Sequence, residues 1–338
     1  MRFGLSFGAL YAPAAEIARL GAEAEAGGFD ALWVPDSQML YRDPYATLAL
    51  LARETRRVRL GTLATNALTR HPAVTANAIL TIQELSGGRA VLGIATGDSA
   101  VRRVGVKPVR LGDLVQAVGE LRTLLAGDAV SYPGGRFAIR FAEKPAPPIY
   151  VVATGLALLE VAGRVADGVV LNVGCHPAVL RTARDRINAG AHAAGRDPAG
   201  IEVVAFFFCT IDDDAATARA RLRPSVSWFC QHFPRLCELA GLPLDVALRR
   251  ELTRFHADYA RYDLVHSAEW AQAVEDAAFL PLAYVDHFAL GGTAADVTGQ
   301  MQAIRALGFE HVAIRPPSAD DWRSTVRAFT EHVMPALR

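Results

Sequence analysis

Short apolar runs alternate along the chain with longer amphipathic stretches. The short runs are rich in β-branched and aromatic residues, which is typical of strands. The predicted strands are Arg2–Phe7, Ala31–Val34, Val58–Gly61, Ala90–Ile94, Ile149–Val152, Gly168–Asn172, Ile201–Thr210 and His311–Ile314. Strands that alternate in this way with helical stretches indicate repeated βα units around a parallel sheet.

The longer stretches repeat apolar residues with the period of an α-helix. In the first of them Ile17, Leu20 and Ala24 share one face, and the pair Gly27 and Gly28 ends the pattern. The predicted helices are Ala14–Ala26, Pro44–Arg53, Ala73–Leu85, Leu111–Leu125, Leu156–Val165, Ala178–Ala193, Ala215–Leu222, Ala294–Leu307 and Trp322–His332. Eight strands joined by right-handed helical crossovers favour an α/β fold of the closed (β/α)₈ TIM-barrel class over an open doubly wound sheet.

Two segments depart from the repeat. Residues 128–148 are rich in proline and glycine and predict a β-hairpin excursion, and residues 223–287 predict a helical insertion between the seventh and eighth strands. The aromatic residues of the insertion are Trp228, Phe229, Phe233, Tyr259, Tyr262 and Trp270. Such residues are usually core, so we favour an extra packed layer over direct substrate contact, with a lid above the barrel mouth as the alternative. We expect one domain over residues 1–338.

The composition excludes several classes of protein. The 338 residues include 35 Lys and Arg and 35 Asp and Glu, so the formal net charge is zero and nucleic acid is not expected as a partner. A hydrophobic fraction of 51% is sufficient for a sizeable core. The start of the chain lacks a signal-peptide pattern, no apolar run is long enough to span a membrane, and the four cysteines lie far apart. We therefore expect a protein of the reducing cytoplasm with no membrane contact.

Motifs for three common kinds of chemistry are missing from the sequence. There is no GxSxG motif for a nucleophilic serine, and the histidines show no HxH or HExxH spacing for a metal. No GxGxxG motif follows a predicted strand, so a Rossmann dinucleotide site is unsupported. We expect no bound metal.

The turns after the predicted strands carry small, hydroxyl and acidic residues. In a barrel these turns meet at one rim, where active sites lie. Two acids, Asp36 and Asp98, follow the second and fourth strands. The candidate site residues on this rim are Asp36, Leu63, Ala64, Thr65, Asn66, Thr96, Asp98, Thr154, Gly155, Gly174 and Cys175.

The residues alone leave the roles of these turns open. The turns at 154–155 and 174–175 precede helices, so their amides are suited to bind a phosphate, but such turns also serve as ordinary connections. Asp98 is a candidate general acid or a hydrogen-bond acceptor for a cofactor, yet an N-cap is the first interpretation of an isolated Asp after a strand. Asp36 has the same ambiguity.

Six stretches of the chain carry family motifs. They are Gly28–Val34, Thr65–Ala76, Glu84–Asp98, Gly155–Gly163, Ala166–Asn172 and His332–Leu337. Together they resemble the bacterial luciferase-like oxidoreductase family. Within that family the sequence looks most like the branch of methylenetetrahydromethanopterin reductase, which uses the deazaflavin coenzyme F420. The likeness covers the chain except for most of residues 223–287.

The resemblance implies a barrel with an insertion that binds FMN or coenzyme F420 in its mouth. Leu63–Ala64 matches a bulge after the third strand, which often contains a non-prolyl cis peptide bond against the flavin ring. Asp98 matches an acid near the reactive face of the cofactor, and Asp36 matches the acid after the second strand. Ser37 stands where several members have a histidine, so proton transfer must use Asp98, Asp36 or water.

The same resemblance implies that Thr154–Gly155 and Gly174–Cys175 belong to loops that hold the cofactor phosphate. Because the chain has no net charge, local amides and nearby arginines must bind an anionic cofactor. Arg102, Arg103 and Arg181 are candidates, for which a solvated helix face is the simpler interpretation.

These expectations combine into a predicted function. We expect an enzyme that transfers hydride between coenzyme F420 and a small organic C=N or C=C substrate, with Asp98 and Asp36 as catalytic residues. The alternative is an FMN-dependent monooxygenase that uses O₂ and receives reduced flavin from a separate reductase. A third class is a flavin-binding relative without turnover. The family also implies a homodimer.

Overall fold

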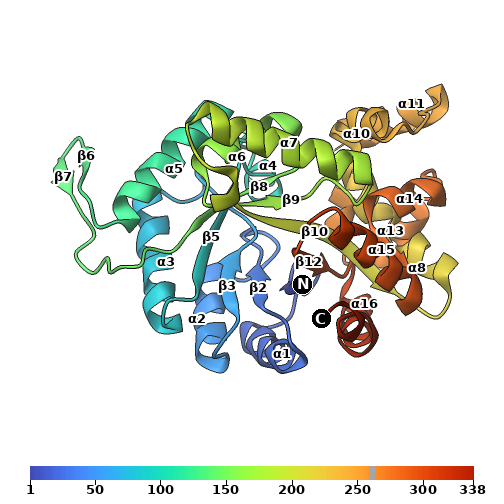
Figure 1. Cartoon of the computed structure of the whole chain (residues 1–338), viewed down its shortest axis with the longest axis horizontal. Coiled ribbons are helices and arrows are strands. Elements are labelled where there is room, and N and C mark those ends of the chain that lie inside the picture. Colours follow the sequence, from blue (N-terminus) through green and yellow to red (C-terminus); the bar gives the residue numbers. More distant parts are fainter. Residues whose placement is uncertain (259–262) are drawn as a thin grey trace.

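The chain folds into a closed barrel of parallel strands (Figure 1). A computed structural model describes residues 1–258 and 263–338. The last barrel strand, β12, closes the ring by pairing with both β1 and β10. The eight barrel strands are β1 (Arg2–Ser6), β2 (Ala31–Val34), β3 (Arg59–Thr62), β5 (Ala90–Ala95), β8 (Ile149–Ala153), β9 (Gly168–Leu171), β10 (Glu202–Ile211) and β12 (His311–Arg315). The predicted TIM barrel is confirmed, with each strand placed to within one residue at either end.

Helices cover the outside of the barrel (Figure 1). They are α1 (Ala14–Gly27), α2 (Pro44–Glu54), α3 (Pro72–Ser86), α4 (Ser99–Arg102), α5 (Leu111–Leu125), α6 (Leu156–Val165), α7 (Pro177–Ala193), η1 (Pro198–Gly200), α8 (Ala215–Arg221), α15 (Ala294–Ala306), α16 (Ala319–Ala328), η4 (Phe329–Val333) and η5 (Pro335–Leu337). Local sequence explains their ends. Helix α1 stops at Gly28, whose φ of 98° is left-handed, and α15 begins at Thr293 in a capping box with Asp296.

Two segments leave the repeat, on opposite sides of the view in Figure 1. Strands β6 (Val130–Tyr132) and β7 (Gly135–Phe137) form an antiparallel hairpin within residues 128–148, as predicted. The elements between β10 and β12 that belong to the insertion are α9 (Arg223–Ser227), η2 (Trp228–Gln231), α10 (Phe233–Ala240), α11 (Val246–Ala257), η3 (Asp263–His266), α13 (Trp270–Asp276) and α14 (Leu282–Phe288). Strand β11 (Leu290–Gly292), absent from the predicted strands, pairs in parallel with the end of β10.

Some expectations about the insertion concern residues that the structure does not describe. Tyr259 and Tyr262 lie outside the described residues. Phe229 and Phe233 are buried in the hydrophobic core, as expected for a packed layer, and Trp270 is buried as well. Within the two described ranges, no helix is long and apolar enough to cross a membrane.

Two large side chains fill the barrel interior. Trp33 on β2 and Tyr150 on β8 are each 1% exposed, and their ring centroids lie 6.2 Å apart. Glycines on neighbouring strands make room for them. A Cβ atom at Gly61 would lie 2.4 Å from the Trp33 ring, and one at Gly168 would lie 2.6 Å from the Tyr150 ring.

A half-buried carboxylate lies at the end of the barrel opposite the predicted rim. Glu202, the first residue of β10, accepts hydrogen bonds from the Tyr150 hydroxyl at 2.5 Å and from Arg59 at 2.8 Å, and its Oε1 lies 2.7 Å from Nδ1 of His311. Burial by itself raises the pKa of Glu202, but these hydrogen bonds outweigh it and hold the pKa well below its ordinary value. The cluster ties β3, β8, β10 and β12 together at this end.

The edge between β3 and β5 is interrupted. Leu60 pairs with Ala90, but further along β4 (Thr65–Asn66) pairs Thr65 with Ile94. Between these two pairs the chain advances by five residues from Leu60 to Thr65, but by only four from Ala90 to Ile94 on β5. One extra residue on one strand of a pair is a β-bulge, as the family resemblance implies for this position.

Gly93 permits this bulge. A Cβ atom at Gly93 would lie 2.0 Å from the carbonyl oxygen of Thr62, so only glycine lets the two backbones approach. The Thr62 hydroxyl donates a hydrogen bond of 2.7 Å to the Gly93 carbonyl and accepts one of 3.0 Å from its amide. The bulge places Leu63 and Ala64 at the barrel mouth.

We expect Gly93→Ala to destabilise the protein by about 2 kcal/mol or more, because the new methyl group overlaps a backbone carbonyl that cannot rotate away. The matched control is Gly119→Ala on the exposed face of α5, where an added Cβ meets no atom within 4 Å. Alanine should stabilise this helix by about 0.5 to 1 kcal/mol. Urea unfolding measures both changes, and equal effects of the two substitutions would contradict the packing role of Gly93.

Candidate active site

A cavity of about 490 Å³ opens at the carboxyl end of the barrel strands. Its wall receives residues from the ends of all eight barrel strands, for example Ser6, Asp36, Ala64, Thr96, Thr154, Asn172, Phe208 and Arg315. Active sites of barrel enzymes lie at this end because the loops after the strands converge there. The cavity is therefore the candidate active site.

Most of the predicted site residues meet in this cavity. Those in its wall are Asp36, Leu63, Ala64, Asn66, Thr96, Asp98, Thr154 and Gly155. Thr65 is fully buried and donates a hydrogen bond of 2.7 Å from its hydroxyl to Oδ2 of Asp36. The Leu63–Ala64 peptide bond is cis, as the resemblance implies.

Gly174 and Cys175 lie outside the cavity wall. The backbone amide of Cys175 donates a hydrogen bond of 3.1 Å to the carbonyl of His287, and the amide of His176 donates one of 2.9 Å to the same oxygen. Because the insertion already occupies these amides, the structure gives no support to the prediction that this turn holds a phosphate. The turn at Thr154 and Gly155 instead leads into α6 at the cavity.

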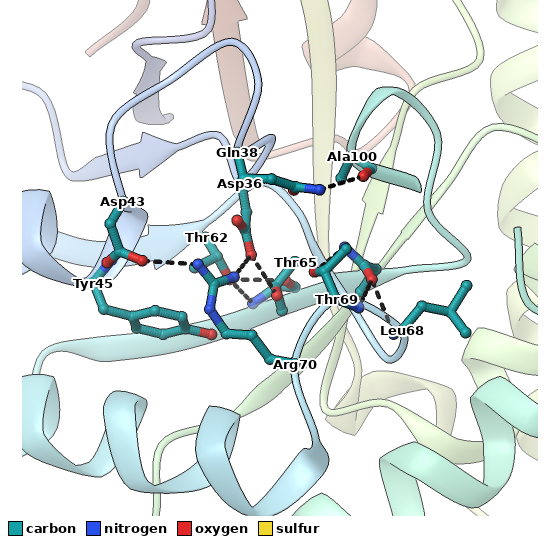
Figure 2. Close-up of polar contacts among 12 residues, drawn as sticks. Asp36, Gln38, Asp43, Tyr45, Thr62, Thr65, Leu68, Thr69, Arg70 and Ala100 are labelled. Carbon is teal, nitrogen blue, oxygen red and sulfur yellow. Dashed lines mark hydrogen bonds and ion pairs between the residues drawn. The ribbon is translucent and has the colours of Figure 1, made fainter. Parts of the chain in front are cut away.

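The carboxylate of Asp36 is held by two strong partners in the cavity wall. Figure 2 shows Thr65 and Arg70 both directed at its Oδ2. Arg70 also donates a hydrogen bond of 2.8 Å to Asp43, the N-cap residue of α2, and its guanidinium lies over the ring of Tyr45. Burial raises the pKa of Asp36, while the Thr65 hydroxyl and the Arg70 guanidinium oppose that shift.

Several polar atoms in the cavity wall are buried and have no hydrogen-bond partner among residues 1–258 and 263–338. They are Oδ1 of Asp36, Oγ of Ser37, Oδ1 of Asn172 and Nε of Arg315. Buried polar groups in proteins are nearly always hydrogen-bonded, and each exception calls for an explanation. Four such atoms around one cavity indicate that it receives a polar ligand.

Asp98 connects the barrel to the insertion. Its Oδ1 accepts a hydrogen bond of 3.0 Å from Nε of Arg102, and its Oδ2 accepts one of 3.0 Å from the indole nitrogen of Trp228. Asp98 occupies the N-cap position of α4, but its side chain makes no capping hydrogen bond to the backbone of that helix. Arg102 lies in the cavity wall, whereas Arg103 pairs with Asp263 of the insertion and Arg181 is not part of the wall.

The insertion contributes wall residues that sequence reasoning missed. Trp228, His232 and His266 all line the cavity, and His232 packs against Gly155 at the start of α6. The sequence predicts Trp228 as a core aromatic because its spacing is the same whether a side chain packs inward or faces a cavity. No local signal in the sequence marks His232 or His266 as wall residues.

Sequence comparison shows which family the chain belongs to. The model of the luciferase-like monooxygenase family matches residues 2–311 of the chain. The chain belongs to this family. It is 32% identical, over 93% of each chain, to 5,10-methylenetetrahydromethanopterin reductase of Archaeoglobus fulgidus. It is 34% identical to F420-dependent hydroxymycolic acid dehydrogenase of Mycobacterium tuberculosis, over 58% of this chain and 59% of that protein.

Solved structures of luciferase-like proteins share the fold. The coenzyme F420 dependent tetrahydromethanopterin reductase of Methanopyrus kandleri superposes with a TM-score of 0.78 and 24% identity, over 100% of this chain and 99% of that one. This likeness covers the insertion as well as the barrel. The described residues of the barrel and the insertion therefore share the fold of that reductase.

We expect Arg70→Met to destabilise the protein by about 3 kcal/mol at pH 7 to 8, because it leaves the buried Asp36 carboxylate without its cation. Burial raises the pKa of Asp36 in the folded state, so the free energy of unfolding falls as the pH rises from the ordinary pKa of an aspartate to the raised pKa. Removing Arg70 raises the folded-state pKa further, so the pH range over which stability is lost extends to higher pH. The loss should therefore shrink at low pH, where Asp36 is protonated.

The matched control is Arg19→Met, which removes an exposed helical pair with Glu23. Its expected effect is below about 0.5 kcal/mol. Urea unfolding of both variants between pH 4 and pH 8 gives the comparison. A loss in Arg70→Met that is independent of pH would contradict the role assigned to the Asp36 charge.

Proposed function

We propose that this luciferase-like protein is an oxidoreductase that uses coenzyme F420 to transfer hydride to or from a small organic substrate in the barrel mouth. The observation that carries the proposal is the cavity itself, in which unpartnered buried polar atoms surround an apolar floor. The reductase and the dehydrogenase among its relatives support the reaction class, and the F420-dependence of the dehydrogenase supports the coenzyme.

The wall suits a planar heterocycle that has a polar edge. Leu63, Ala64 and Val152 form an apolar floor above the filled barrel interior. Oδ1 of Asp36 and Oδ1 of Asn172 are available acceptors at the rim of that floor. The volume of about 490 Å³ lies within the range of roughly 300 to 1,000 Å³ typical of small-molecule sites.

The deazaflavin supplies a ring carbon that accepts or donates hydride, and the protein supplies position and electrostatics. In this proposal Asp36 and Asp98 contact the polar edge of the ring and hold or release a proton there. Burial raises the pKa of Asp36, and the Thr65 hydroxyl and the Arg70 guanidinium oppose that shift. Asp98 is kept in place by Arg102 and Trp228.

The remaining predicted residues contribute binding surface. We propose that Leu63, Ala64, Asn66 and Thr96 contact the ring, and that Thr65 acts through Asp36. The amides at the start of α6, after Thr154 and Gly155, are the candidate site for the phosphate because a helix N-terminus favours anions. We propose that Trp228, His232 and His266 of the insertion, which line the mouth, help to exclude water from the reacting atoms.

An FMN-dependent monooxygenase is the second candidate, favoured by the description of the matching family. In that case a separate reductase has to supply reduced flavin. A titration with each cofactor distinguishes the two functions.

We expect the purified protein to bind oxidised coenzyme F420 at least about 100-fold more tightly than FMN, a difference of about 2.7 kcal/mol. Quenching of tryptophan fluorescence follows both titrations because Trp228 lies in the cavity wall. Tighter binding of FMN would replace the proposal with the monooxygenase function.

A substitution of Asn172 locates the bound coenzyme. Asn172→Leu removes an unpartnered buried amide oxygen, so it should leave stability unchanged or raise it by up to about 1 kcal/mol while weakening F420 binding roughly tenfold. The matched control is Thr210→Val, which removes a buried unpartnered hydroxyl outside the cavity wall and should not change binding. Equal affinities of the two variants would place the coenzyme elsewhere.

We also propose a homodimer in the cytoplasm. Helix α3 exposes Val74 and Leu85 along one stripe, with Thr81 between them, and neighbouring α2 exposes Leu50. We propose that these exposed apolar side chains on two adjacent helices belong to the dimer interface. Light scattering should give twice the chain mass of 36.2 kDa, and Val74→Arg should reduce it to the single mass. Val246→Arg, at an exposed site in the insertion, is the control and should leave the mass unchanged.

A further inference from the structure

A histidine and an aspartate from the insertion form a pair beside the cavity. Both lie on η3, the short helix Asp263–His266. Nδ1 of His266 is 2.9 Å from Oδ1 of Asp263, and the imidazole forms part of the cavity wall. None of the described residues forms a hydrogen bond with Nε2 of His266, the ring nitrogen on the other side.

The pair is held in place from the barrel side. Asp263 is 9% exposed and forms an ion pair with Arg103, which follows α4. The Tyr11 hydroxyl donates a hydrogen bond of 2.9 Å to the backbone carbonyl of His266. The ring of Tyr41 meets the imidazole edge-on at 6.2 Å. These contacts come from the loops after β1, β2 and β5.

We propose that His266 is a catalytic residue that exchanges a proton with a heteroatom of the substrate, and that Asp263 and Arg103 are positioning residues that act through it. The inference rests on the proposed function, since it concerns the substrate of the same cavity. It also specifies the substrate class. The reacting group of the substrate is an alcohol that is oxidised to a carbonyl, or an amine that is oxidised to an imine. It is not a carbon–carbon double bond.

When the substrate is oxidised, it loses a hydride and a proton to two different acceptors. The substrate C–H bond breaks, and its hydrogen leaves with both bonding electrons to the oxidised deazaflavin. The substrate O–H or N–H bond breaks, and its proton passes to Nε2 of His266. The electron pair left on the heteroatom forms the C=O or C=N bond. The reverse reaction returns hydride to carbon and the proton from Nε2 to the heteroatom.

The charges around His266 support the role of a base. Burial lowers the pKa of His266, Asp263 opposes that shift, and Arg315 on β12 adds to it. Asp98 also favours the charged form, while Tyr11 and Tyr41 face the ring from the other loops. A neutral imidazole that donates its Nδ1 proton to Asp263 presents the lone pair of Nε2 to the cavity.

Other groups in the wall are less suited to this step. Both carboxylate oxygens of Asp98 already accept hydrogen bonds from Arg102 and Trp228. Oδ2 of Asp36 accepts from Thr65 and Arg70.

The test combines turnover with a measurement on the substrate-free protein. The wild type with oxidised coenzyme F420 is assayed with a panel of primary and secondary alcohols and cyclic amines. His266→Gln should lower kcat by about 100-fold or more while the Kd for coenzyme F420 stays unchanged. Imidazole added to His266→Ala should restore part of the rate. Asp263→Asn should cause a smaller loss, and the acid limb of its pH profile should move to lower pH.

The second readout is the ¹⁵N spectrum of histidine-labelled protein without coenzyme. The His266 signals are identified by their absence in His266→Gln. They should show a neutral ring with the proton on Nδ1 at pH 7, and Asp263→Asn should lower the pKa and remove that tautomer preference. The control is His192→Gln. His192 is exposed near the end of α7, so this substitution should change neither the rate nor these signals.

Three results would overturn the inference. They are an unchanged rate in His266→Gln, a proton on Nε2 in the wild-type spectrum, and turnover of none of the alcohols and amines by protein that binds coenzyme F420. A protein that does not bind coenzyme F420 at all overturns the proposed function instead. In that case the tautomer of His266 still decides whether the pair exists as described.

Discussion

The carboxylate of Asp36 is the constraint on which the mouth of the barrel depends. A buried carboxylate is tolerated only when hydrogen bonds and a counter-ion compensate for lost hydration. Thr65 and Arg70 provide that compensation, and both follow the bulge between β3 and β5 (Figure 2). Arg70 in turn reaches Asp43 at the start of α2. One charge therefore fixes the loops after β2 and β3 against each other.

The bulge makes this arrangement possible. The extra residue between β3 and β4 places Leu63 and Ala64 in the cavity floor and sets Thr65 behind the wall. Gly93 lets the Thr62 carbonyl approach the opposite strand. Below the floor, Trp33 and Tyr150 fill the barrel, so the ligand space is confined to the mouth.

Local sequence predicts the barrel because each strand is an apolar run whose limits are visible in the chain. It predicts the rim acids for the same reason, since Asp36 and Asp98 directly follow two of those runs. Long-range contacts are not visible in this way. The amide of Cys175 is occupied by the carbonyl of His287, and Asp98 is bound by Trp228, 130 residues further along the chain. No local pattern distinguishes such partners from neighbours in a core.

We propose that the barrel mouth holds coenzyme F420 between the cavity floor and the insertion. A crystal structure of the protein with oxidised coenzyme F420 tests this placement. We expect density for the deazaflavin ring in the cavity, in contact with Leu63 or Ala64, and with a ring atom within hydrogen-bond distance of Oδ1 of Asp36 or Asn172. A coenzyme bound outside this cavity, or a ring that leaves both oxygens unpartnered, would contradict it.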